Sequence, residues 1–275
     1  MKKNLPYIGI VFFLLFLSEY VSATEQFTIT LQANESAPYW SKHTHYCSGM
    51  GCEIIAAISK EMGITTKIEF RPLKRLIADT ANNDLGNPLF YMSNQSFAAI
   101  VPIAVTYSAF FSYLPYVREC SSHPSANGCI QKRIGALKGT ISDPRTLFTF
   151  GKFEESYSHE SLFKKLKKGR INIALELDLV GSNTIRTLFQ DEVNNFDIRI
   201  IPQTASPLAI MIDSSLPNAV NIGHRYQEGL HQIIQKGIYQ KIIQKYYAKT
   251  KIPEDWYSNL SNFEALYAIA PSRDD

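Results

Sequence analysis

The sequence of 275 residues lacks a long hydrophobic run, a strong excess of charge and any repeated or low-complexity tract. Its first apolar run, residues 7–17, is too short for a membrane-spanning helix, which needs about 20 residues. The 28 basic and 25 acidic residues leave a formal charge of only +3, and they are spread along the chain, so no nucleic-acid-binding surface is expected. The composition, 45% hydrophobic and 19% charged, is that of a globular protein and excludes collagen-like, disordered and coiled-coil classes.

The amino-terminal segment has the pattern of a cleaved signal peptide. Lys2 and Lys3 precede the apolar run, and Val21, Ser22 and Ala23 form a small-residue cleavage pattern. We therefore expect residues 1–23 to be removed and the mature protein to be exported in soluble form. An uncleaved membrane anchor at this end is the alternative.

Export changes how the four cysteines are interpreted. Cys47 lies five positions before Cys52, and Cys120 lies nine positions before Cys129. Four cysteines allow three pairings, and in an oxidising compartment two local disulfides, Cys47–Cys52 and Cys120–Cys129, are favoured. A catalytic cysteine is the alternative, and it would need a histidine base beside it in the fold.

Strand and helix patterns alternate along the chain. Phe27, Ile29 and Leu31 alternate with polar residues, as in a strand. A helix pattern follows and ends at Gly63, and alternation returns over residues 64–70. This order predicts a parallel sheet with helical crossovers. A second such unit begins near residue 133, and residues 217–250 are expected to be helical, so two α/β lobes with open sheets fit better than one.

The order of several short stretches resembles the extracellular solute-binding proteins of family 3, the amino-acid-binding type, which have the type 2 periplasmic binding protein fold. No stretch is specific alone, but together they cover nearly all of residues 25–250. They are Ala37-Pro38-Tyr39-Trp40, Gly49-Met50-Gly51-Cys52-Glu53-Ile54-Ile55, Arg71-Pro72-Leu73-Lys74-Arg75, residues 135–140, Gly169-Arg170-Ile171-Asn172 and residues 237–246.

The resemblance implies two lobes joined by a hinge of two crossings, near residues 113–117 and 205–209. Lobe 1 would comprise residues 24–115 plus 206–275, and lobe 2 residues 118–205. Such lobes close on a ligand like jaws. The implied function is that of a periplasmic, monomeric substrate-binding protein, without cofactor or catalysis, which delivers a small solute to an ABC-type permease or reports it to a sensor.

The resemblance also implies ligand-binding residues. Tyr39 and Trp40 follow the first strand, where family members place an aromatic ring against the ligand, although either ring could instead pack in the lobe. Gly139 and Thr140 precede an expected helix start, where free N–H groups favour an anionic group, although a plain strand-to-helix turn explains the same two residues. Arg75 matches a recurrent family arginine and could equally form an ion pair within its lobe.

One family feature is missing. Members that bind α-amino acids use an arginine to clamp the carboxylate, yet no Lys or Arg occurs between Arg75 and Arg118. The family's aspartate for the amino group falls near Leu177, between Glu176 and Asp178, which become the candidate ligand-binding acids. The missing clamp favours a cationic or neutral ligand over a standard amino acid.

Two other functions remain open from the sequence. Some proteins of this fold are dehydratases, and Glu176 would then be the general acid, its pKa raised when the lobes close. Alternatively, His43 and His45 could share a metal ion, although an exposed polar loop explains the same residues. No Ser/His/Asp order, phosphate loop or metal-ligand spacing supports other chemistry.

Overall fold

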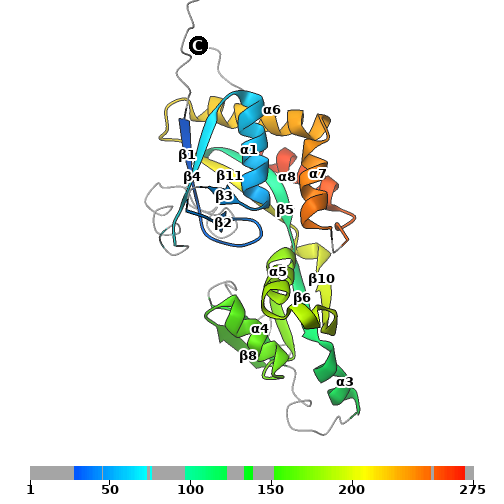
Figure 1. The fold of residues 1–275 in the computed structure, drawn as a ribbon. Helices are drawn as coiled ribbons and strands as arrows, with labels where there is room; N and C mark the ends of the chain where they lie inside the picture. Colours follow the sequence, from blue (N-terminus) through cyan, green and yellow to red (C-terminus); the bar gives the residue numbers. More distant parts are fainter. Residues whose placement is uncertain are drawn as a thin grey trace, which may run out of the picture.

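The structure, a computed structural model, describes residues 28–44, 46–72, 75, 97–122, 133–138, 152–248 and 251–269. These residues form two α/β bodies, one above the other in Figure 1, and each has its own hydrophobic core. We call the body around the larger core the first lobe and the body around the smaller core the second lobe. None of the described helices is long and apolar enough to cross a membrane.

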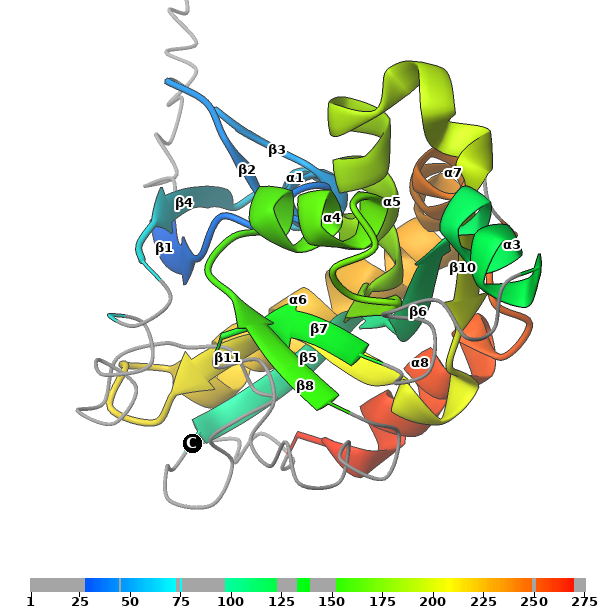
Figure 2. The same ribbon diagram turned by 90° about the horizontal axis from the view of Figure 1, so that it is seen from below.

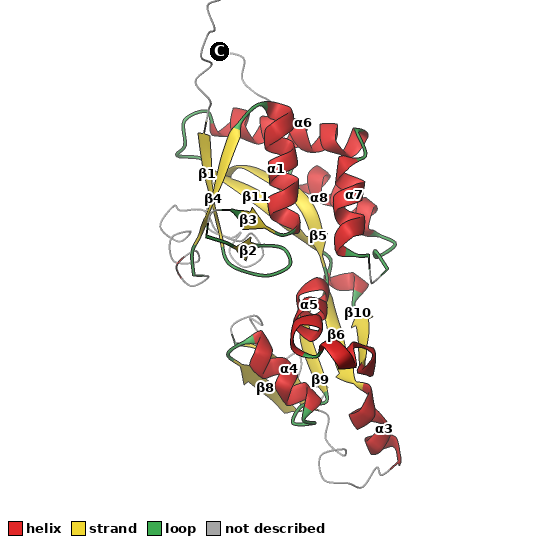
Figure 3. Ribbon diagram, in the orientation of Figure 1, coloured by secondary structure: helices red, strands yellow, loops and turns green. Residues whose placement is uncertain are grey.

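The first lobe contains two pairs of long strands covered by helices (Figure 3). One pair is parallel and is connected through a helix, as the sequence predicts, and the other pair is antiparallel. A short hairpin follows the first strand. The elements are β1 (Thr28–Ala33), β2 (Ser41–Lys42), β3 (Cys47–Ser48), α1 (Met50–Met62), β4 (Thr65–Phe70), β5 (Phe97–Thr106), β11 (Ser206–Asp213), α6 (Ala219–Gln235), α7 (Ile238–Tyr246) and α8 (Trp256–Leu266).

Helix α1 shows how the pattern of apolar residues fixes the first lobe. Ile54, Ile55 and Ile58 fall on one face and are buried in the core. The helix ends at Gly63, whose φ of 60° is the left-handed conformation that glycine adopts without strain. The helix and its end are therefore those expected from the sequence. The helical region expected over residues 217–250 is divided into α6 and α7 at Gly237, whose φ is 69°.

The second lobe is built on a five-stranded sheet in the order β10-β6-β9-β7-β8. Strand β7 runs parallel to β8 and β9, whereas β6 is antiparallel to β9 and β10. Helices α4 and α5 lie side by side on one face of this sheet (Figure 2). The elements are β6 (Ser108–Tyr113), α3 (Leu114–Ser122), β7 (Arg133–Leu137), β8 (Lys152–Ser156), α4 (His159–Lys167), β9 (Ile173–Leu177), α5 (Asp178–Leu188), the 3-10 helices η2 (Gln190–Asn195) and η3 (Pro202–Thr204), and β10 (Phe196–Ile200).

The chain crosses between the lobes at two adjacent places. It leaves β5 and enters β6 at Tyr107, and it returns through residues 201–205 to β11. We expected the first crossing near residues 113–117, but Tyr113 ends β6 inside the second lobe and residues 114–117 begin α3. The reason is that Ala109 and Phe111 pack into the second core, which draws β6 into the second sheet.

A disulfide joins Cys47 of β3 to Cys52 in the first turn of α1, with their Cα atoms 5.8 Å apart, which confirms the first expected pair. The bridge fixes the short hairpin to the helix. The second expected pair, Cys120 and Cys129, lies outside the residues whose side chains the structure describes.

We predict that Gly181→Ala destabilises the second lobe. A Cβ atom at residue 181 would lie 2.2 Å from the ring of Phe111, which is fully buried and cannot move aside. Overpacking of this kind costs about 1–3 kcal/mol of unfolding free energy, measurable by urea denaturation. Gly63→Asn is the control, because a Cβ there meets nothing within 4 Å and Asn tolerates a positive φ. Equal losses in the two variants would contradict the prediction.

Candidate functional site

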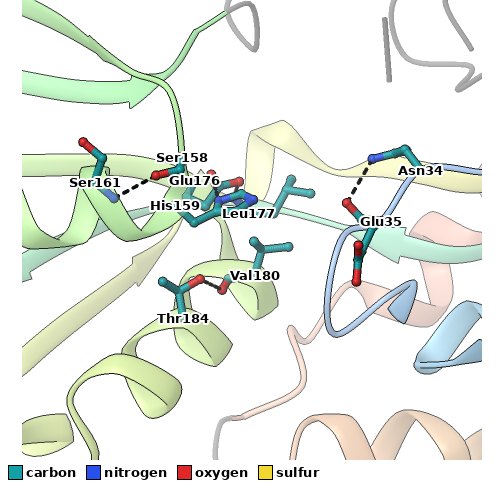
Figure 4. A network of polar contacts seen from close by, with 9 residues as sticks. All are labelled: Asn34, Glu35, Ser158, His159, Ser161, Glu176, Leu177, Val180 and Thr184. Carbon is teal, nitrogen blue, oxygen red and sulfur yellow. Dashed lines mark hydrogen bonds and ion pairs between the residues drawn. The ribbon is translucent and has the colours of Figure 1, made fainter. Parts of the chain in front are cut away.

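The ends of parallel strands from both lobes define the candidate site. In open α/β sheets, ligands bind beyond the carboxyl ends of the strands. In the first lobe β1 ends at Ala33, and in the second lobe β8 ends at Ser156 and β9 at Leu177. Figure 4 shows the loop after β1, with Asn34 and Glu35, on the side toward which Leu177 and Val180 of the second lobe project. We call Asn34, Glu35, Ser158, His159 and Leu177 the interlobe site.

A histidine and a carboxylate form a pair at the second-lobe side of this site (Figure 4). His159 Nδ1 lies 3.0 Å from Glu176 Oε2, and Glu176 Oε1 accepts a hydrogen bond of 2.9 Å from the Leu177 N–H. Ser158 caps α4 by accepting a hydrogen bond from the Ser161 N–H, which places His159 in the first turn of the helix.

This pair leaves one ring nitrogen of His159 available. The Glu176 carboxylate is the hydrogen-bond acceptor beside Nδ1, so the neutral ring of His159 carries its proton on Nδ1. Nε2 then has a lone pair and can accept a hydrogen bond. Nε2 has no hydrogen-bond partner among the described residues. The side chain of His159 is 38% exposed, whereas that of Glu176 is only 8% exposed. Glu176 therefore positions the ring, and His159 is the more exposed member of the pair.

Leu177 ends β9 between the two acids that the sequence singles out. It is half-buried and packs against the first core. At this position the interlobe site therefore has an apolar surface in place of a charged group.

Asp178 occupies a different place from its neighbour Glu176. Its side chain is buried, with Oδ1 accepting a hydrogen bond of 3.2 Å from the Tyr39 hydroxyl and Oδ2 one of 2.7 Å from the Tyr247 hydroxyl. Its N–H donates to the carbonyl of Tyr107 over 2.9 Å. Both tyrosine hydroxyls come from the first lobe and Asp178 begins α5 of the second. We call Tyr39, Tyr107, Asp178 and Tyr247 the interlobe hub.

Burial dominates the electrostatics of the hub. Desolvation raises the pKa of Asp178 above its usual value, while the hydrogen bonds from Tyr247 and Tyr39 act in the opposite direction. Desolvation and the nearby carboxylate raise the pKa of Tyr39 and of Tyr247, so both hydroxyls remain donors. Asp178, which we expected to face a ligand, thus has both oxygens engaged in a contact between the lobes.

The hub extends to the last helix of the first lobe. The Tyr107 hydroxyl donates to Asp255 Oδ1 over 2.8 Å and accepts from Asn259 over 3.1 Å. Trp256 is fully buried, and its ring centre lies 5.3 Å from that of Tyr247. The residue at the first crossing is therefore anchored to α8.

Trp40, unlike Tyr39, is only half-buried. Its ring packs over Gly51 so closely that a Cβ there would lie 2.5 Å from it. Trp40 also lines a small apolar pocket with Leu31, Ile55 and Met211. Of the two expected aromatic ligand contacts, Tyr39 is in the interior and Trp40 keeps part of its ring accessible.

The other expected site residues are placed as follows. Arg75 is exposed, and its N–H donates to the Pro72 carbonyl over 2.9 Å. Gly139 and Thr140 lie outside the described residues.

The alternative metal site is only partly described. His43 Nε2 lies 2.8 Å from Ser48 Oγ, and the ring stacks on Tyr46 with centres 4.4 Å apart. His45 lies outside the described residues. Within the described ranges, no three His, Cys, Asp or Glu side chains gather as metal ligands would.

The sequence did not single out three residues of the interlobe site and hub. His159 carries no motif and was not among the expected site residues. Its one signal is its place directly after Ser158, a helix cap that follows a strand end. Tyr107 and Tyr247 gave no signal, since only the fold brings them to Asp178.

We predict that Tyr247→Phe destabilises the protein in a pH-dependent way. Because the folded state binds the Asp178 proton more tightly than the unfolded chain does, stability falls as pH rises between the unfolded and folded pKa values. Loss of the Tyr247 hydrogen bond raises the pKa of Asp178 further and widens this range. We expect the variant to lose about 1–3 kcal/mol of unfolding free energy at about pH 7 and less at about pH 4.

Urea unfolding of the wild type and the variant at several pH values measures this effect. The matched control is Tyr257→Phe, since Tyr257 is 41% exposed and makes no hydrogen bond to a described side chain. A loss for Tyr247→Phe that does not change with pH would show that Asp178 does not titrate through the hub.

Comparison with known proteins supports the architecture. No protein-family model and no curated protein matches the sequence. Solved structures do match: the arginine-, lysine-, histidine-binding protein ArtJ of Geobacillus stearothermophilus has 13% identity and a TM-score of 0.56, with 86% of this chain and 100% of that chain covered. A histidine kinase sensor domain similar to periplasmic binding proteins has 16% identity and a TM-score of 0.55, over 81% of this chain and 96% of its own.

The GluR0 ligand-binding core of Nostoc punctiforme, solved with L-glutamate, has 13% identity and a TM-score of 0.55, over 80% of this chain and 99% of its own. The similarity thus extends across both lobes in proteins of very different sequence. The chain has the type 2 periplasmic binding protein fold.

Proposed function

We propose that this chain is an exported solute-binding protein of family 3 that captures a small molecule between its lobes. The observation that carries the proposal is that the loop after β1 of the first lobe, with Asn34 and Glu35, lies opposite Leu177 at the end of β9 of the second (Figure 4), with two adjacent crossings between the lobes. We assign residues 24–106 and 206–275 to the first lobe and residues 108–200 to the second, because these boundaries follow the membership of the strands in the sheets.

The described part of the interlobe site favours a neutral or cationic ligand. Its ionisable side chains are Glu35, which is exposed, and His159, which pairs with Glu176. It contains no arginine or lysine that could bind a carboxylate. The similar GluR0 ligand-binding core was solved with L-glutamate. A ligand of that class would need its carboxylate bound by other groups, for which Arg75, Gly139 and Thr140 remain our candidates.

The proposed ligand contacts are His159 Nε2 of the interlobe site and, from the first lobe, the exposed part of the Trp40 ring. The imidazole would exchange a hydrogen bond with the solute, and the indole would stack on its apolar part. Leu177 would add apolar contact. Glu176 is a positioning residue, because its two oxygens are already engaged by His159 and the Leu177 N–H.

The same engagement argues against catalysis by Glu176. A general acid must present a proton to the substrate, whereas Glu176 accepts hydrogen bonds at both oxygens. We propose ligand-stabilised closure of the lobes without turnover, with delivery to a membrane permease or a signal to a sensor.

We predict that a neutral or cationic small solute stabilises the mature chain, residues 24–275, in a thermal-shift screen. The panel comprises amino acids, polyamines, organic acids, sugars, aromatic compounds and divalent metal ions. A ligand at about 100 times its Kd adds about 2.7 kcal/mol of stability, which is easily detected. A mixture of each hit with the protein, followed over time, should show no loss of solute. Stabilisation by metal ions alone would contradict the proposal.

We further predict that His159→Ala weakens binding of the hit at least about tenfold by calorimetry, because a polar partner at the site is lost. Glu176→Gln should weaken it less, since it loosens the ring without removing it. His231→Ala is the matched control: His231 also pairs with a glutamate, Glu264, at 3.0 Å, but on α6 of the first lobe. Equal effects of His159→Ala and His231→Ala would contradict the assignment.

A further inference from the structure

A groove on the first lobe lies along one edge of β4. Its volume is about 980 Å³, and α1, β4 and the β2–β3 hairpin line it. On the α1 side it is bordered by Ile55, Ala56, Ser59 and Lys60. None of these residues is a proposed solute contact, although Ile55 also lines the small pocket beside Trp40.

The backbone of β4 carries, on the groove side, hydrogen-bonding groups that no described strand pairs with. Strand β4 pairs only with β1 among the described strands. The Arg71 N–H donates to the Ala33 carbonyl, and in a parallel ladder every second residue points its N–H and C=O toward the partner strand. The N–H and C=O groups of Thr66, Ile68 and Phe70 therefore point away from β1, along the open edge.

The side chains of β4 show that the strand itself is firmly placed. The Thr66 hydroxyl lies 2.7 Å from Ser59 Oγ and 2.8 Å from the Tyr226 hydroxyl, and Ile68 packs against the first core. An added strand would meet a fixed template, and such templates bind extended segments through backbone hydrogen bonds.

The charge around the groove is unbalanced. Lys42, Lys60 and Lys67 are exposed, and none of them makes an ion pair with another described residue. The nearby acids are already compensated, because Glu61 pairs with Lys236, Glu53 with Lys245 and Glu69 with Arg71. Three cations around one open strand edge favour an acidic occupant. A second copy of this chain would bring the same three lysines and be repelled.

We propose that this groove binds an acidic, extended segment of a partner protein, which adds a strand to the free edge of β4. Alternate side chains of the segment would contact Ile55 and Ala56 of α1, and its acidic residues would face Lys67 and the neighbouring lysines. Backbone pairing supplies affinity and the charges supply selectivity.

The test measures fluorescence anisotropy of a labelled, eight-residue peptide of alternating Val and Glu with the mature chain. We expect saturable binding that weakens with added salt and falls at least about tenfold in the Lys60→Glu, Lys67→Glu double variant. A peptide with Lys in place of Glu should bind that variant better than it binds the wild type. The control variant replaces Lys168 and Lys241, two exposed lysines outside the groove, with Glu, and it should bind the peptide as the wild type does.

Two further measurements separate strand addition from simple charge attraction. Alternate amides of an extended peptide point to opposite edges, and only one edge would pair with β4. N-methylation of the amides on that edge should abolish binding, whereas N-methylation of the amides on the other edge should leave binding intact. The proposal would be overturned if neither set of N-methyl groups weakened binding, if the Lys60→Glu, Lys67→Glu variant bound the peptide as the wild type does, or if the peptide did not bind at all. Sedimentation showing that the chain pairs with itself through β4 would also overturn it. Solute binding should be unchanged in the double variant, so failure of this proposal is distinguishable from failure of the proposed function.

Discussion

The relation between the two lobes depends on one buried carboxylate. Asp178 begins a helix of the second lobe, yet both of its oxygens accept hydrogen bonds from tyrosines of the first. A buried charge that lost these donors would carry a large desolvation cost. The hydrogen bonds therefore hold the first turn of α5 against the first core, and Leu179 and Val180 pack there beside Asp178.

The start of α5 also gives two nearby acids, Glu176 and Asp178, different roles. Glu176 points to His159 at the interlobe site, whereas Asp178, two residues later, is buried in the hub. In a continuing strand, residues two apart would face the same way. Here β9 ends at Leu177 and α5 begins at once, so the second acid turns inward. The acid that positions His159 and the acid that joins the lobes are thus two residues apart in the sequence but lie in different places in the fold.

Local patterns predicted the elements better than the contacts between them. The apolar spacing of α1, its end at Gly63 and the Cys47–Cys52 bridge are properties of short segments, and the structure has all three. The hub could not be predicted, because Tyr39, Tyr107, Asp178 and Tyr247 meet only after both sheets have formed. Alternation alone also could not assign β6 to a lobe, since Ala109 and Phe111 would suit either core. His159 was missed because a single histidine carries no spacing signal.

The crossings at Tyr107 have a mechanical consequence. Thr106 and Ser206 are partners in the β5–β11 ladder, and the Ile201 N–H donates to the Ser108 carbonyl on the other side of Tyr107. Thr204 adds a bond from the Ser108 N–H to its hydroxyl. The connection between the lobes is therefore a two-stranded ribbon, not a pair of separate tethers. A ribbon bends and twists about its long axis far more easily than its strands slide past each other. It restricts the lobes to rotation and resists their separation by shear.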